Sequence, residues 1–413
     1  MHFLYNCSIV FYGFLIRFAA LFNAKAKLWV IGRRNWKEKL PNIDSSAKVY
    51  WFHCASLGEF DQGLPVIREL KKKIPTAYIL VTFFSPSGML HYHKRKHEVD
   101  HVMYLPLDTI ANARYFLGFF NPEKIYVIKY EFWANFIFQA NKRGIDIYSV
   151  SSNFRENQLY FKWYGAFFRK ILKNINYFFV QTEESHTLLN SIGITSVSVV
   201  GDTRFDQVIE VRNNMLEQIN NGNLDPDFLK IQSFLNGQKA IVIGSSWKIE
   251  EELVIPFILK NPNRKFIIAP HDISEEHINF IINKLENKCI RFTNYDGVIS
   301  SDNCMILDTI GHLSKAYYFG DIAIIGGGFT GKLHNILEPT SFGLPVLFGP
   351  KHDKFPEAQL FIKNGLAFEF ENCEVLERQI LDLTVKLNEI RPRIEVFVNS
   401  FIGSSDQIIK LSN

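Results

Sequence analysis

The sequence is poor in cysteine, and none of its cysteines forms a C-x-x-C pair. Only five cysteines are present, scattered along the chain. A small, odd and dispersed set argues against a disulfide framework and against a zinc site of the usual spacing. The simplest interpretation is a protein of a reducing, cytoplasmic compartment.

The chain also lacks a strong excess of either charge. Its formal net charge is +4 over 413 residues, so nothing global calls for a nucleic-acid partner, and we expect none. Internal repeats and low-complexity tracts are missing as well. With 47% hydrophobic and 21% charged residues, the composition is that of a folded protein with room for two or three domains.

Apolar and basic residues are concentrated at the N-terminus. Residues 3–22 are apolar except for Asn6, Ser8 and Arg17, which comes close to the roughly 20 residues that span a bilayer. Seven basic residues lie within the first forty positions: Arg17, Lys25, Lys27, Arg33, Arg34, Lys37 and Lys39. Because this charge follows the apolar run and no small-residue cleavage site is evident, a cleaved signal peptide is not expected.

We therefore predict that residues 1–40 form a membrane anchor, either spanning the bilayer or lying in its inner leaflet. The basic residues would hold the rest of the protein on the cytoplasmic side. The alternative is an ordinary helix packed on the protein.

From residue 49 onward, short apolar runs alternate with amphipathic stretches, which is typical of a parallel sheet covered by helices. Predicted helices include residues 63–73, 110–119 and 132–142. A polar stretch, residues 213–227, predicts a linker and the start of a helix. Strands are predicted at residues 49–53, 78–82, 101–105, 124–129, 146–149, 177–181, 197–201, 239–243, 265–269, 322–325 and 345–347, with two short ones within 297–307.

The sequence thus predicts two consecutive α/β domains, residues 41–212 and 213–413. The second is expected to end in a helical region, residues 374–410, with a break near Pro392. A cleft between two such domains is the default place for a ligand.

The stretch WFHCASLGEFDQG, residues 51–63, places a carboxylate just behind the end of a predicted strand. Ser56 and Glu59 have the spacing of a capping box, which would make Glu59 a helix-start residue. Alternatively, Glu59 is a catalytic base, because open α/β sheets keep their ligand clefts at the carboxyl ends of strands. The spacing alone leaves both interpretations open.

A glycine-rich turn follows another predicted strand. Residues 326–331 satisfy G-x-G-x-x-G, and Asp353 follows about 20 residues later, as a dinucleotide fingerprint requires. The continuation favours a nucleotide or nucleotide-sugar pocket instead, since it carries Lys332, His334 and a carboxylate, Glu338, that can bind a ribose. Backbone N–H groups would hold the phosphate. An ordinary glycine turn before a capped helix remains the alternative.

Five motifs occur in order along the chain: S-x-G-E at residues 56–59, T-x-x-[ST]-x-[ST]-G at 82–88, E-x-W-x-N at 131–135, G-x-x-[KR]-[FY]-D at 201–206, and H-N-x-L-E-P with G-x-P-V and G-P at 334–350. With the apolar, basic N-terminus, this ordered set resembles the 3-deoxy-D-manno-oct-2-ulosonic acid (Kdo) transferases of lipopolysaccharide assembly. The chain departs from that pattern at residues 153–157, 245–247, 270–271 and 311–313, where contacts to the donor are expected to differ.

The resemblance implies a GT-B glycosyltransferase, in which two Rossmann-like domains face a central cleft. It implies a CMP-Kdo donor, a lipid A precursor of the lipid IVA type as acceptor, and transfer with inversion at the cytoplasmic side of the bacterial inner membrane. Such a displacement needs one base near the acceptor oxygen, and we assign that role to Glu59, with Asp61 in reserve. We expect no metal and no cofactor, because no D-x-D motif occurs at a strand end in the predicted cleft.

The resemblance also directs the choice of binding residues. The leaving CMP is assigned to Gly327, Gly328, His334 and Asn335, with Glu338 on the ribose. Further substrate or donor contacts are assigned to Ser56, Gly58, Glu131, Arg204, Lys248 and His271. Lys248 and His271 could equally be surface side chains, Glu131 a helix cap, and Arg204 part of a structural ion pair.

Three other functions are compatible with parts of the pattern. A soluble GT-B epimerase or hydrolase would use a UDP-sugar and need no anchor. An NAD-dependent oxidoreductase would use glycines 326–331. A lipid-surface scaffold would bind membranes but no nucleotide.

Overall fold

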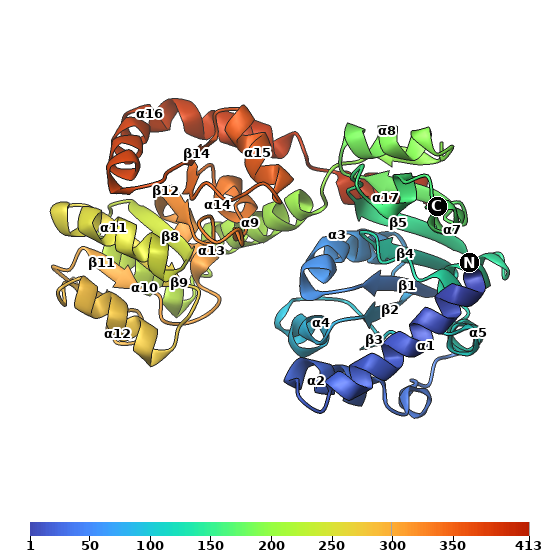
Figure 1. The fold of residues 1–413 in the computed structure, drawn as a ribbon. Coiled ribbons are helices and arrows are strands. Elements are labelled where there is room, and N and C mark those ends of the chain that lie inside the picture. Colours follow the sequence, from blue (N-terminus) through green and yellow to red (C-terminus); the bar gives the residue numbers. More distant parts are fainter. Residues whose placement is uncertain (299, 413) are drawn as a thin grey trace. The chain divides into compact units, whose positions relative to one another are not determined.

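The computed structural model describes residues 1–298 and 300–412, which form two compact units (Figure 1). Unit 1 comprises Met1–Gln207 together with the residues from Gly403 onward, and unit 2 comprises Val208–Ile402. Each unit is built on a parallel sheet of seven strands, so the predicted pair of α/β sheets is confirmed. The sequence assigned everything after residue 213 to one domain, whereas the last helix packs with unit 1.

The sheet of unit 1 has the strand order β3-β2-β1-β4-β5-β6-β7, with β1 near its centre. Strand β1 is buried on both faces, because β2 and β4 flank it and helices cover both sides. Its side chains alternate, so that Trp51 enters one core cluster and Phe52 the other. The strands are β1 Val49–Cys54, β2 Tyr78–Phe83, β3 His101–Tyr104, β4 Lys124–Ile128, β5 Asp146–Ser152, β6 Tyr177–Val180 and β7 Val197–Val199.

Helices cover both faces of this sheet. Side chains of α5, α6, α7 and α8 contribute to one core cluster, and those of α3 and α17 to the other. The helices are α1 His2–Ala19, α2 Ala24–Arg33, α3 Leu57–Lys73, α4 Pro86–His91, α5 Ile110–Phe120, α6 Ala134–Asn141, α7 Ala166–Leu172, α8 Glu183–Ser191 and α17 Ser404–Leu411, with 3-10 turns η1 Trp36–Lys39, η2 Tyr92–Lys94 and η3 Leu159–Phe161.

The sheet of unit 2 has the order β10-β11-β9-β8-β12-β13-β14. Helix α9, Arg204–Asn220, leads into it. Its strands are β8 Ala240–Ser246, β9 Lys265–Pro270, β10 Cys289–Arg291, β11 Cys304–Ile306, β12 Gly320–Ile325, β13 Val346–Phe348 and β14 Ala367–Glu369, and its helices are α10 Pro226–Leu235, α11 Lys248–Lys260, α12 Glu275–Lys284, α13 Leu313–Tyr318, α14 Leu337–Ser341, α15 Pro356–Lys363 and α16 Cys373–Asn399.

Three details of the sequence prediction are wrong. Within 297–307 the described residues form only one strand, β11, while β10 precedes that region. Residues 213–220 belong to helix α9 rather than to a linker. Helix α16 continues through Pro392, because Ile390 and Ile394 are buried on either side and this packing outweighs the hydrogen bond lost at proline.

Helix α1 lies on unit 1 and leaves a broad apolar face exposed. Ile9 and Gly13 are buried against the unit. Six large apolar side chains at helical spacing are each more than half exposed: Phe3, Leu4, Val10, Phe11, Phe14 and Phe18. Among the residues that the structure describes, no helix is both long enough and apolar enough to cross a membrane.

Candidate active site

Glu59 lies on the first turn of α3, directly after strand β1. Its carboxylate accepts hydrogen bonds from the backbone N–H groups of Ala55 and Ser56. Ser56 is the N-cap residue, but its side chain makes no capping hydrogen bond, so only half of the capping box forms. Glu59 therefore holds the start of helix α3 through its carboxylate.

The surroundings of Glu59 favour its protonated form. Burial and, to a smaller extent, the charge of Glu131 raise the pKa of Glu59 from 4.5 to about 7, against the opposing effects of the backbone N–H bonds and Lys129. A carboxyl group with a pKa near neutrality can accept and release a proton at physiological pH.

Glu131 follows strand β4, which pairs with β1, so the two strand ends bring Glu131 and His53 together. The Glu131 Oε2 atom lies 3.5 Å from His53 Nε2. On its other side, His53 Nδ1 is hydrogen-bonded to Thr82 Oγ1 at 2.9 Å, and Thr82 also accepts a 2.8 Å bond from the Trp51 indole N–H. The sequence did not foresee a role for His53, although it stands beside the S-x-G-E motif.

His53 and Glu131 line a small cavity of about 20 Å³ with aromatic walls that include Trp51 and Trp133. Three buried polar atoms there, His53 Nε2, Glu131 Oε2 and Trp133 Nε1, have no hydrogen-bond partner among the described residues. Buried polar groups are normally hydrogen-bonded. The cavity has room for about one water molecule, not for a substrate.

Two carboxylates near these motifs are held by arginines. Asp61, the reserve base, forms a bidentate pair with Arg95, with Nε–Oδ1 and Nη2–Oδ2 distances of 2.6 and 3.0 Å. Arg204 is paired with Asp202 at 2.6 Å. Both Asp61 and Arg204 therefore have an ion-pair partner within the chain. For Arg204, this structural ion pair is the alternative that the sequence analysis named beside substrate binding.

Asp206, which ends the G-x-x-[KR]-[FY]-D motif, holds the start of helix α17. Its carboxylate oxygens accept the backbone N–H groups of Gly403 and Ser405, both at 2.7 Å. A carboxylate at a helix N-terminus satisfies otherwise unpaired donors there. This motif therefore ties the C-terminal helix to unit 1.

Asn135 of the E-x-W-x-N motif lies far from bulk solvent and holds helix α1 in place. Its side chain accepts a 2.9 Å bond from His2 Nε2 and donates to Asn6 Oδ1 at 2.8 Å. Beside it, the buried Asp108 carboxylate accepts hydrogen bonds from the Tyr5 hydroxyl and from two backbone N–H groups of α6. The only sequence signal for this polar cluster was Asn6 within an apolar helix.

In unit 2 the glycine turn follows strand β12 and encloses a carboxylate of the chain itself. Gly327, at a φ of +87°, donates its N–H to Glu250 Oε1 at 2.8 Å. The fully buried Glu250 also accepts the Trp247 N–H at 3.2 Å and the Phe329 N–H. A dinucleotide phosphate would need these amides, so the geometry does not favour the oxidoreductase alternative.

Gly328 serves close packing in the same turn. A Cβ atom at Gly328 would lie 2.4 Å from the backbone nitrogen of Gly349. By contrast, a Cβ atom at Gly58 in unit 1 would meet nothing within 4 Å. The two glycines therefore differ: the first is required by the fold, and the second borders open space.

His334 stands at the end of the glycine turn, in contact with two aromatic rings. The Trp247 indole N–H donates a 3.1 Å hydrogen bond to His334 Nε2. The His271 ring packs against both, with centroid distances of 4.4 Å to Trp247 and 4.6 Å to His334. Burial lowers the pKa of His334 to about 4, and His271 contributes to the shift, so His334 is neutral at physiological pH.

The remaining predicted donor residues of unit 2 have partners of their own. Asn335 Oδ1 accepts the Leu337 N–H at 3.0 Å at the start of α14. The Glu338 carboxylate accepts a hydrogen bond from the Ser314 hydroxyl. Lys248 is exposed, with its Nζ 4.7 Å from the Phe280 ring centroid.

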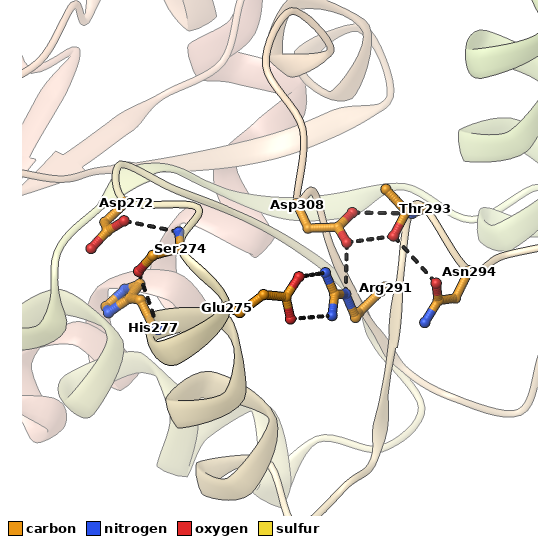
Figure 2. Close-up of polar contacts among 8 residues, drawn as sticks. All are labelled: Asp272, Ser274, Glu275, His277, Arg291, Thr293, Asn294 and Asp308. Atoms are coloured by element: carbon orange, nitrogen blue, oxygen red, sulfur yellow. Dashed lines mark hydrogen bonds and ion pairs between the residues drawn. The ribbon is translucent and has the colours of Figure 1, made fainter.

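Polar contacts connect the loop after strand β9 with its neighbours (Figure 2). Asp272 Oδ1 accepts the Ser274 N–H at 2.9 Å, and Ser274 caps helix α12. The next residue, Glu275, forms a bidentate pair with Arg291, which also binds Asp308 at 2.7 Å. This chain of contacts joins α12 to β10 and to the end of β11.

Comparison with known proteins agrees with these motifs. Residues 34–207 match the family model described as 3-deoxy-D-manno-octulosonic-acid transferase (kdotransferase). A 3-deoxy-D-manno-octulosonic acid transferase of Aquifex aeolicus is 26% identical over 361 residues, covering 86% of this chain and 90% of the relative. The enzyme of the same name from Rickettsia felis is 28% identical over 351 residues, covering 82% of this chain and 72% of the relative.

Solved structures share the fold. A UDP-GlcNAc 2-epimerase of Neisseria meningitidis, bound to UDP-GlcNAc, superposes with a TM-score of 0.62 at 18% identity, over 89% of this chain and all of that one. A glycosyltransferase of Rickettsia africae superposes with a TM-score of 0.54 at 14% identity, over 89% of this chain and 98% of that one. These likenesses show a GT-B-like fold.

Among residues 1–298 and 300–412, no group of three or more His, Cys, Asp or Glu side chains is arranged to hold a metal ion.

Proposed function

We propose that this chain is a Kdo transferase, a glycosyltransferase that moves Kdo from CMP-Kdo to a lipid A precursor with Glu59 as the base. The match of residues 34–207 to the family model and the two relatives at 26% and 28% identity support this proposal. The observation that carries the proposal is the position of Glu59: a buried carboxyl group at the carboxyl end of a central parallel strand, with a pKa raised to about 7. Ligand clefts of open α/β sheets lie at this edge.

The proposed reaction is a direct displacement. Glu59 takes the proton of an acceptor hydroxyl, and the oxygen forms a bond to the anomeric carbon of Kdo. The bond between that carbon and the CMP phosphate oxygen breaks, and CMP leaves with the electron pair. Inversion follows from a single displacement.

We propose that the acceptor approaches unit 1 beside Glu59. The open space at Gly58 leaves room for a substrate, and the partly exposed Glu131 carboxylate follows the neighbouring strand β4. Glu131 would then have two effects, binding the acceptor and raising the pKa of Glu59. Ser56 contributes by starting the helix that carries Glu59.

We propose that the donor binds to unit 2 near the glycine turn. His334 and His271 present aromatic faces and nitrogen atoms at the carboxyl ends of β12 and β9. The Gly327 N–H is held by Glu250, so side chains rather than this amide would bind the donor. Asn335, Glu338 and the exposed Lys248 are close in sequence to these groups and remain candidates.

We further propose that the enzyme works at the cytoplasmic face of the bacterial inner membrane, with α1 lying in the interface. The exposed Phe and Leu side chains of α1 suit the acyl region, and the exposed basic residues that follow suit anionic headgroups. Arg33 is the exception, because it is buried and donates to the backbone carbonyls of Phe84 and Leu105. An acceptor that is itself a lipid explains why an enzyme would carry such a face.

The test is transfer of labelled Kdo from CMP-Kdo to a lipid A precursor by the wild type and by Glu59→Gln. The proposal predicts transfer by the wild type and a loss of at least about 100-fold in the variant, as expected for a missing general base. Glu69→Gln, on the same helix, is the matched control and should transfer normally. Transfer by both would leave Glu59 a helix-start residue.

Absence of transfer by the wild type would instead favour a nucleotide-sugar epimerase or hydrolase, for which the fold likeness to a UDP-GlcNAc 2-epimerase is the supporting observation. Binding of UDP-GlcNAc rather than CMP would identify that case.

A further inference from the structure

We propose that Trp247 is a positioning residue for the donor site: its indole N–H fixes the tautomer of His334, so that the histidine presents Nδ1–H to an oxygen atom of the nucleotide sugar. This inference rests on the proposed function for the identity of the ligand, but its structural part concerns only residues of unit 2.

The direction of the hydrogen bond decides the tautomer. An indole N–H can only donate, so the atom that it approaches at 3.1 Å, His334 Nε2, must carry a lone pair. A neutral imidazole with an unprotonated Nε2 carries its proton on Nδ1. The tryptophan therefore leaves Nδ1–H as the only donor that the His334 ring can offer.

The backbone around the pair keeps it in this geometry. Glu250 accepts the N–H groups of Trp247 and Gly327, and so ties the start of α11 to the glycine turn. The backbone N–H of His334 donates to the Gly326 carbonyl at 3.1 Å, and the backbone N–H of His271 donates to the Ser246 carbonyl at 2.9 Å. Trp247 directly follows strand β8, and His334 is bonded to the residue that follows β12, so both partners of the indole hydrogen bond lie at strand ends.

The electrostatic surroundings also keep His334 neutral. His271 packs against its ring, and protonation of both rings would place two positive charges side by side. Lys332 lies nearby, with its Nζ 6.0 Å from the Trp247 ring centroid, and the Glu250 carboxylate is engaged with backbone N–H groups. Consistently, burial and His271 lower the pKa of His334.

The sequence had marked this position only as a departure, since the related motif reads S-T-H where this chain has Ser245, Ser246 and Trp247. In the structure, the tryptophan at this position donates a hydrogen bond to His334. A neutral, oriented donor recognises an oxygen atom without adding charge, so its contribution to donor binding should be nearly independent of pH above about 5.

Trp247→Phe is the direct test, because it retains an aromatic ring for stacking and removes the N–H. The first measurement is the ¹⁵N NMR spectrum of histidine-labelled protein, with His334→Gln used for assignment. We expect Nδ1 protonated in the wild type, and a population of the Nε2–H tautomer with a pKa closer to 6.5 in Trp247→Phe. Trp163→Phe, at an exposed tryptophan of unit 1, is the control and should leave the His334 signals unchanged.

The second measurement is CMP affinity by calorimetry between pH 5.5 and 8. The ratio of the dissociation constants of Trp247→Phe and wild type cancels the titration of CMP itself. We expect the variant to bind about fivefold more weakly at pH 7.5, the equivalent of one modest hydrogen bond, and the ratio to fall toward one at pH 5.5 as the freed histidine becomes cationic.

Unchanged ¹⁵N signals in Trp247→Phe would overturn the tautomer assignment. Changed ¹⁵N signals together with equal CMP dissociation constants of Trp247→Phe and wild type at every pH would overturn the role in donor binding. If Trp247→Phe unfolds, a benzothienyl-alanine at position 247 keeps the ring size and lacks the N–H. A wild type that does not bind CMP would refute the proposed function, while the NMR experiment would still decide the tautomer.

Discussion

The Tyr5 hydroxyl donates a 2.6 Å hydrogen bond to Asp108 Oδ2, joining two residues 103 positions apart and attaching helix α1 to unit 1. Burial raises the pKa of the Asp108 carboxyl group, although Tyr5 and two backbone N–H groups lower it. The polar side of α1 is thus used for attachment, which leaves the apolar side for another contact.

Removal of the Tyr5 hydroxyl should loosen this helix. Tyr5→Phe leaves one side of a buried carboxylate without its donor, and we expect it to lower the free energy of unfolding by about 1–3 kcal/mol. Faster hydrogen exchange of residues in α1 is the specific readout. Tyr164→Phe, at an exposed tyrosine of the same unit, is the control and should change neither quantity.

The exposed face of α1 should determine binding to membranes. We expect Phe14→Glu or Phe18→Glu to weaken sedimentation with vesicles of anionic phospholipid about tenfold or more, because each removes one large apolar side chain from the interface. Stability should change little, since both side chains are more than half exposed. Val385→Glu, at an 85% exposed position of unit 2, is the control, and equal effects of all three changes would refute an α1-specific contact.

The pH profile of transfer should follow Glu59. If the ionised carboxylate is the base, kcat/KM for the acceptor should rise with pH and level off above about 7. Glu131→Gln removes the charge that helps to raise the pKa of Glu59, so the rising limb should move to lower pH. An unmoved limb would mean that another group sets the profile.

Glu59 should also make stability depend on pH. Its pKa is raised from 4.5 to about 7 in the folded protein, so the folded state binds more protons between these values and the unfolding free energy falls as pH rises through this range. Above pH 7 the cost amounts to about 3 kcal/mol. Glu59→Gln should therefore gain stability relative to wild type at pH 8 and much less at pH 5, as measured by urea unfolding. Equal gains at both pH values would contradict a raised pKa.

Alanine substitutions at Gly328 and Gly58 should differ in their effect on stability. Gly328→Ala forces a methyl group against the Gly349 backbone and should lower the unfolding free energy by about 1–3 kcal/mol. Gly58→Ala should change stability by no more than about 0.5 kcal/mol, because its Cβ atom would meet nothing. A loss of transfer in the stable Gly58→Ala variant would then be an effect on substrate binding, whereas full activity would remove this space from the proposed acceptor site.

The sequence by itself determined the two parallel sheets, since their buried strands are continuous apolar runs, and it located Glu59 at the end of one of them. It also supplied the ordered motifs that the family comparison supports. These features could be predicted because they depend on residues close together in the sequence, whose hydrophobic periodicity and turn-forming residues indicate strands, turns and helices.

Only the tertiary structure decided what those residues contact. The pKa of Glu59 depends on burial and on Glu131 from another strand, and the glycine turn encloses Glu250, which no spacing rule could indicate. Likewise, Asn135 and Asp206, both in motifs that suggested ligand binding, hold helices α1 and α17. Desolvation and hydrogen bonds between distant segments arise only once the chain is packed, because they depend on distances in space rather than along the sequence.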